Sequence, residues 1–72
     1  MKQFHLNEWL KDKSLKIVNR DGLPVRIACY DRKGTDFPII YLVDRGHAEY
    51  YGICNEDGLA FMSGDILLWF AD

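Results

Sequence analysis

Apolar and polar residues alternate with a period of two along most of the chain, which predicts β-strands. The clearest run, residues 25–30, places Val25, Ile27 and Cys29 on one face and Arg26, Ala28 and Tyr30 on the other. Residues 37–43 are apolar on both faces, as in a strand that is covered on both sides. Further strands are expected at residues 15–19, 49–54, 59–62 and 66–70.

Residues 1–14 are the only segment with a helical pattern. Leu6, Trp9 and Leu10 recur at a spacing of three and four, which gives one apolar stripe. Asn7 is the expected N-cap, and Glu8 suits the first turn. A helix of this length is marginal alone, so it is expected to form by docking Trp9 onto an apolar surface.

The same turn phrase occurs twice, as Asn19-Arg20-Asp21-Gly22-Leu23 and Asn55-Glu56-Asp57-Gly58-Leu59. An Asn side chain can hydrogen-bond its own backbone, and Gly supplies the positive φ that closes a three-residue hairpin loop. The phrase therefore predicts two hairpins. Duplication of a unit and convergence on good turn chemistry both explain it.

These elements predict a mainly β fold, bordering on α+β. We expect a curved, half-barrel-like antiparallel meander of about five strands over residues 15–72, with one short helix in residues 1–14. Residues 1–72 then form a single domain. A chain of this size has little room for a ligand pocket of about 300 Å³.

The composition is globular, with 49% apolar residues and a net charge of −2. Residues 1–36 carry eight Lys or Arg and five Asp or Glu, whereas residues 37–72 carry one Arg and six Asp or Glu. The net negative charge of the chain argues against a dedicated nucleic-acid-binding protein, which normally has a basic surface. No apolar run has the length of a signal peptide core or of a membrane span, so a cytoplasmic location is expected.

The residues that often carry chemistry are dispersed. Cys29 and Cys54 form no C-x-x-C motif and are expected to be reduced and buried. Together with His5 and His47 they lack the paired spacing of a zinc site. No nucleophile or phosphate-binding motif is present. We therefore expect no catalytic residue, metal or cofactor, and a protein that is not an enzyme.

Four aromatic residues in two strands are the leading candidates for a contact surface. Neighbouring residues of a strand point to opposite faces, so each pair places one ring on each side of the sheet. The rings could lie in the core or contact a partner, either another protein or a second copy of the chain. The candidate interaction residues are Tyr50, Tyr51, Trp69 and Phe70, with the segment 66–70 as the expected contact.

Binding of nucleic acid is the alternative function. Arg26 and Tyr30 are expected to share a face, which would join a basic and an aromatic side chain in one small patch. The candidate residues for this alternative are Arg20, Arg26, Tyr30, Arg32 and Lys33, with Lys16 nearby in the sequence.

The run N-R-D-G-L-P-V-R-I-A-C-Y-D-R-K-G over residues 19–34, followed by F-P-I-I-Y-L-V over residues 37–43, resembles a small domain common in gut bacteria and their phages. Such domains show an R-D-G turn, a V-R-I strand, a D-R-K-G loop, a Y-P-I strand and a T-E-D-G-like turn. Asn55 stands here where Thr is usual. The resemblance spans roughly residues 13–72. It implies a short cytoplasmic or phage-encoded protein and brings with it no activity and no site residue.

Overall fold

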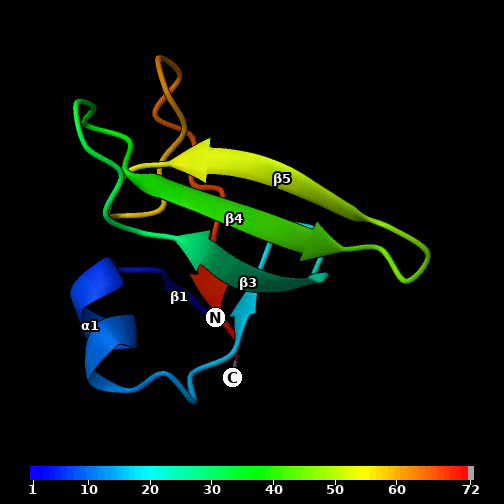
Figure 1. The fold of residues 1–72 in the computed structure, drawn as a ribbon. Helices are drawn as coiled ribbons and strands as arrows, with labels where there is room; N and C mark the ends of the chain where they lie inside the picture. The colour runs from blue at the N-terminus through cyan, green and yellow to red at the C-terminus, as the bar shows by residue number, and fades with distance from the viewer. Residues whose placement is uncertain (72) are drawn as a thin grey trace.

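Six strands form one antiparallel sheet that curls into a half-barrel, with a single short helix beside it (Figure 1). The computed structural model describes residues 1–71. The sheet order is β1-β6-β2-β3-β4-β5. The strands are β1 (Lys2–Gln3), β2 (Ile17–Val18), β3 (Pro24–Cys29), β4 (Ile39–Asp44), β5 (Glu49–Cys54) and β6 (Trp69–Phe70), and the helix is α1 (Leu6–Lys11). The predicted fold class is thereby confirmed.

The strand order departs from a simple meander at its last step. β2 to β5 follow one another as predicted, but β6 returns to lie between β1 and β2. The predicted strand at residues 59–62 is wrong, because only a single bridge joins Leu59 to Ile66 and a turn lies between them. The expected strand at residues 66–70 is reduced to β6.

The helix is shorter than the predicted segment 1–14. It covers only Leu6–Lys11, and its N-cap is His5 rather than Asn7. Lys2 and Gln3 pair with Phe70 and Trp69 instead of being helical. The helix buries Leu6 and packs Trp9 against the core, as docking of its apolar stripe requires.

A β-bulge in β3 changes which residues share a face. Ile27 is paired with Tyr41 and Cys29 with the next residue of β4, Ile40, so Ala28 is an extra residue. Such a bulge shifts the alternation of side chains beyond it. Cys29 therefore faces away from Val25 and Ile27, which corrects the predicted face.

The three long strands have a buried and a solvent-facing side. The inner side carries the core residues Ile39, Tyr41 and Cys54. No helix or strand among residues 1–71 packs over the opposite side. We call it the outer face; its side chains are those of Arg26, Cys29, Ile40, Leu42, Glu49, Tyr51 and Ile53.

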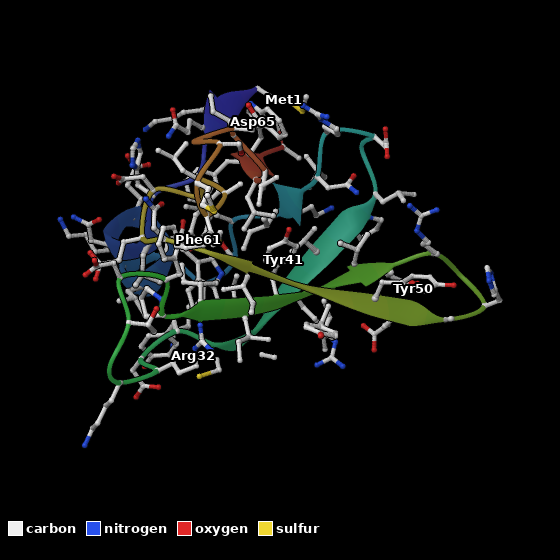
Figure 2. All side chains as sticks on the ribbon, turned by 90° about the horizontal axis from the view of Figure 1, so that it is seen from above. Met1, Arg32, Tyr41, Tyr50, Phe61 and Asp65 are labelled. Carbon is white, nitrogen blue, oxygen red and sulfur yellow. The ribbon has the colours of Figure 1, made fainter. Side chains whose placement is uncertain are left out.

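The ring of Tyr41 covers a glycine on the inner side of the sheet. Tyr41 is paired with Gly52 of β5 and points into the molecule (Figure 2). A Cβ atom placed on Gly52 would overlap the ring and hydroxyl atoms of Tyr41, far inside van der Waals contact. An aromatic ring over a strand glycine fills the volume that the missing side chain leaves.

The two copies of the turn phrase have the same local hydrogen bonds. Asn19 Oδ1 accepts from the N–H groups of Asp21 and Leu23, and Asn55 Oδ1 accepts in the same way from Asp57 and Leu59. Gly22 and Gly58 have φ values of 79° and 75°, as the turn chemistry predicts. The first turn joins β2 to β3 as a hairpin, whereas the second leads out of the sheet.

The second turn anchors the N-terminal segment. Leu6 N–H donates to Glu56 O at 2.8 Å, and Gln3 Nε2 donates to Asp57 O at 2.9 Å. His5 Nδ1 lies 3.0 Å from Asp57 Oδ1. Gly58 is buried, and a Cβ there would lie 3.4 Å from the Cβ atoms of Leu68 and Phe4. The sequence offers no sign of this difference between the two copies.

Substituting Asn for Gly22 or Gly58 tests the packing around each position. Asn tolerates a positive φ, so the substitution adds little backbone strain. We expect Gly22→Asn to destabilise the protein by about 0.5 kcal/mol or less, since nothing lies near that position. Gly58→Asn should destabilise it by about 1–3 kcal/mol, because its side chain must fit into the packed space beside Leu68 and Phe4. Urea unfolding measures both; equal losses would contradict the buried role of the second turn.

Candidate interaction surface

The outer face ends at an open sheet edge. β5 pairs with β4 on one side and with no strand among residues 1–71 on the other. Tyr51 is 75% exposed and Ile53 is 37% exposed on this face, and Leu42 between β3 and β5 is partly exposed. A charged pair borders them, since Arg26 Nε and Nη2 donate to the Glu49 carboxylate at 2.8 and 2.9 Å.

This pair holds its charges on the surface. The hydrogen bonds from Arg26 lower the pKa of Glu49, and the Glu49 carboxylate raises the pKa of Arg26. Both groups are solvent-exposed, so their attraction contributes little to folding. Their effect is to fix one positive and one negative group beside the apolar residues of the outer face.

The backbone of β5 offers alternate residues to the open edge. Arg45 N–H donates to Ala48 O where the β4–β5 hairpin closes. Bonded and non-bonded pairs alternate in an antiparallel ladder. Tyr50, Gly52 and Cys54 therefore direct their N–H and C=O groups toward β4, whereas Glu49, Tyr51 and Ile53 direct theirs away from it.

The four predicted interaction aromatics divide into two groups. Tyr50 and Tyr51 lie on opposite faces of β5 as expected and are 52% and 75% exposed. Tyr50 lies toward the far end of the β4–β5 hairpin, with the Arg45 guanidinium 5.5 Å from its ring centroid (Figure 2). Trp69 and Phe70 belong to β6, which has β1 on one side and β2 on the other.

The prediction of segment 66–70 as a contact surface is wrong. Phe70 is in the core, with its ring centroid 5.3 Å from that of Phe4, and Trp69 is half-buried. Leu68 is fully buried. The segment pairs inside the fold, because β6 lies between β1 and β2 and pairs with both.

The basic residues proposed for nucleic acid do not form one surface. Arg20 is in the β2–β3 turn, and Arg26 is on the outer face. The bulge turns Tyr30 to the inner side, where its ring lies 6.2 Å from that of Trp9, so the predicted shared face of Arg26 and Tyr30 is wrong. Arg32 donates from Nη2 to Phe37 O within the following loop, in which Lys33 is exposed. Nucleic-acid binding stays a prediction that this arrangement does not favour.

The cysteines do not pair with one another. Both are free thiols, with Cys54 fully buried and Cys29 partly buried. Burial raises the pKa of the Cys54 thiol to about 12, which leaves it protonated and unreactive at neutral pH. Within residues 1–71 no cluster of three or more His, Cys, Asp or Glu side chains has the arrangement of a metal site.

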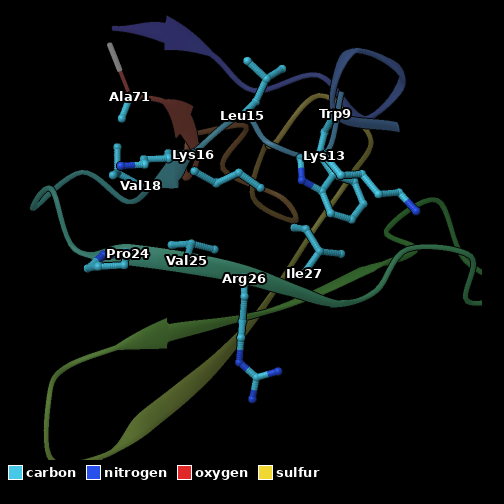
Figure 3. Close-up of a pocket in the computed structure, with 11 residues that line it drawn as sticks. Trp9, Lys13, Leu15, Lys16, Val18, Pro24, Val25, Arg26, Ile27 and Ala71 are labelled. Atoms are coloured by element: carbon cyan, nitrogen blue, oxygen red, sulfur yellow. The ribbon is translucent and has the colours of Figure 1, made fainter. Parts of the chain in front are cut away.

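A groove lies on the surface beside β3. It has a volume of about 380 Å³ and is open to solvent (Figure 3). We call it the β3 groove. Its lining comes from the α1–β2 segment, from β2 and β3 and from Ala71, and includes Trp9, Lys13, Leu15, Lys16, Val18, Val25 and Ile27.

Sequence reasoning also missed an exposed tip between β5 and β6. Phe61 and Met62 are 65% and 89% exposed, and Met62 has a φ of 67°. The Phe61 ring packs edge-on against Phe37 of the 30–38 loop, with centroids 5.0 Å apart. The Ser63-Gly64 pair next to Met62 is the signal of a turn that the predicted strand at 59–62 overlooked.

No protein-family model, no curated protein and no solved structure matches this chain. None of the helices in the described part of the chain has the length and apolar character needed to cross a membrane. The surfaces described above are therefore the only basis for a functional proposal.

Proposed function

We propose that the protein is a small, non-catalytic interaction module that associates with a second copy of itself through the edge of β5. One observation carries the proposal. The outer face is apolar and uncovered, and it borders the open edge of the six-residue strand β5 at Tyr51. An exposed edge presents unpaired backbone groups that another strand can satisfy.

The pattern of β5 fits antiparallel pairing with its own copy. A two-fold axis perpendicular to the sheet and passing between the two Gly52 residues places Tyr51 of one copy opposite Ile53 of the other. Both residues direct their N–H and C=O groups to the open edge, so each such pair exchanges two hydrogen bonds. Aromatic and β-branched side chains opposite each other also stabilise a strand pair. The axis generates this pair twice.

The surroundings of the pair are self-complementary. Shifting the strands by one residue would place outer-face side chains opposite inner-face ones, which the pleat does not allow. On the inner side, the bare Gly52 lets the two strands meet without a side chain at the axis. Each copy also carries one Arg26–Glu49 ion pair beside the proposed interface. Because each pair contains one positive and one negative group, the two copies do not repel each other there.

The experiment is sedimentation equilibrium of the wild type and of Tyr51→Ser over about 10 µM to 1 mM. We expect a reversible dimer with a dissociation constant within that range, because one strand pair buries less area than a standard interface. Tyr51→Ser should weaken the dimer about tenfold, since the variant loses its pair twice.

The matched control is Tyr50→Ser. It removes a neighbouring exposed tyrosine of the same strand, but from the inner side, so dimerisation should change by about twofold or less. A wild type that stays monomeric at about 1 mM would contradict the proposal. Equal weakening by the two variants would place the contact elsewhere on β5.

A cytoplasmic location, an origin in phage or mobile elements and the resemblance described above stay predictions. They are compatible with an accessory protein that acts by association. The absence of a catalytic role is likewise a proposal, supported by the dispersal of the titratable side chains.

A further inference from the structure

We propose that the β3 groove binds an extended peptide segment of another protein, one with apolar side chains flanked by acidic residues. The site is separate from the β5 edge and does not depend on self-association. Three features of the groove carry the proposal: its apolar lining, its charge and the backbone of β3.

The lining gathers apolar side chains that the core leaves partly exposed. Trp9, Leu15, Val25 and Ile27 pack against the core cluster yet are not buried themselves. Figure 3 shows the side chains of the α1–β2 segment across the groove from those of β3. A volume of about 380 Å³ accommodates two or three apolar side chains of a ligand.

The charged side chains that line the groove are basic within residues 1–71. Lys13 and Lys16 belong to the lining, and no Asp or Glu of that range does. Lys13 Nζ lies 5.4 Å from the Trp9 ring centroid, which holds the ammonium group beside the apolar surface. The side chain of Arg26 points away from the groove (Figure 3), toward Glu49 on the outer face. Lys13 and Lys16 are therefore the groups of the groove that would pair with the acidic side chains of a bound peptide.

The backbone of β3 distinguishes a peptide from a small amphipathic acid. Within β3, only Pro24 and Val25 pair with β2, so no strand among residues 1–71 lies beside the rest of β3 on the groove side. Asn19 N–H donates to Leu23 O in the adjoining hairpin. By the alternation of the ladder, Ile27 directs its N–H and C=O groups to this side. An extended peptide can exchange two hydrogen bonds with it, as in strand addition.

The test is titration of the full chain with defined peptides, followed by NMR and calorimetry. The probe is Ac-Asp-Val-Val-Val-Asp-NH2, and the matched peptide carries Lys in place of Asp. We expect the acidic peptide to bind at about millimolar concentration or below and to shift the Ile27 amide, and the basic peptide to bind at least about tenfold more weakly. N-methylation of the central valine should abolish the shift, because it removes the pairing donor.

Variants of two exposed lysines locate the site. Lys16→Glu should weaken the acidic peptide about five- to tenfold, whereas Lys33→Glu in the 30–38 loop should leave its affinity unchanged. Several results would overturn the proposal: no binding of the acidic peptide at about 5 mM, equal binding of both peptides, or octanoate binding as tightly as the peptide. Shifts at Tyr51 and Ile53 in place of Ile27 would assign the peptide to the β5 edge instead.

Discussion

Phe4→Ala is expected to remove about 3–5 kcal/mol from the free energy of unfolding. Phe4 is fully buried, its ring packs on Phe70, and its N–H donates to Leu68 O at 3.2 Å. It thus joins the N-terminal segment to the returning strand β6. A domain of this size has a total stability of only about 4–11 kcal/mol, so this loss is a large fraction of the total.

Urea unfolding followed by circular dichroism measures the loss. Leu10→Ala is the control, because Leu10 is also an apolar residue near the N-terminus but is 40% exposed on α1. We expect it to cost about 0.5 kcal/mol or less. A loss of under about 1 kcal/mol for Phe4→Ala would show that the N-terminal segment is not part of the core.

Gly52→Ala should destabilise the protein by about 2–3 kcal/mol although it adds a single methyl group. The new Cβ would overlap the ring of Tyr41, which is only 8% exposed and has core side chains around it. The ring must then rotate away from β5 and give up packing in the core. Burial of its hydroxyl also raises the pKa of Tyr41.

A double-mutant cycle with Tyr41→Ala attributes the effect to this contact. Without the ring, Gly52→Ala should cost about 0.5 kcal/mol or less, since an alanine suits a strand better than a glycine does. Additive losses in the cycle would contradict the overlap. Thermal unfolding of the four proteins supplies the measurement.

The sequence predicts the parts of the fold that local chemistry determines. The two Asn-x-Asp-Gly turns and the strands β3, β4 and β5 follow from turn residues and alternation over a few positions. The pairing of Trp69 with Gln3 and Val18 joins residues more than fifty positions apart, and no local pattern encodes it. The two copies of the turn phrase also differ because Leu68 and Phe4 pack against Gly58, whereas nothing among residues 1–71 packs against Gly22.

The candidate surfaces are harder to predict than the strands. One extra residue in a strand changes which side chains share a face of the sheet. An extra residue at Ala28 reverses Cys29 and Tyr30 relative to Arg26, and alternation alone shows no bulge there. Tyr51 is exposed on the outer face, as expected for one member of a tyrosine pair that points to opposite faces of a strand, and its role in an interface stays a prediction. The same reasoning predicts an exposed ring in the Trp69–Phe70 pair, but Phe70 lies in a strand with neighbours on both sides and its ring is buried.

The proposed dimer forms when β5 pairs with its own copy through Tyr51 and Ile53. The most direct measurement is the dependence of backbone amide NMR shifts on protein concentration from about 20 µM to 1 mM. We expect concentration-dependent shifts centred on Tyr51 and Ile53, with reduced amide exchange at the same two residues. Shifts confined to the Phe61–Met62 tip, or no shifts over this range, would contradict it.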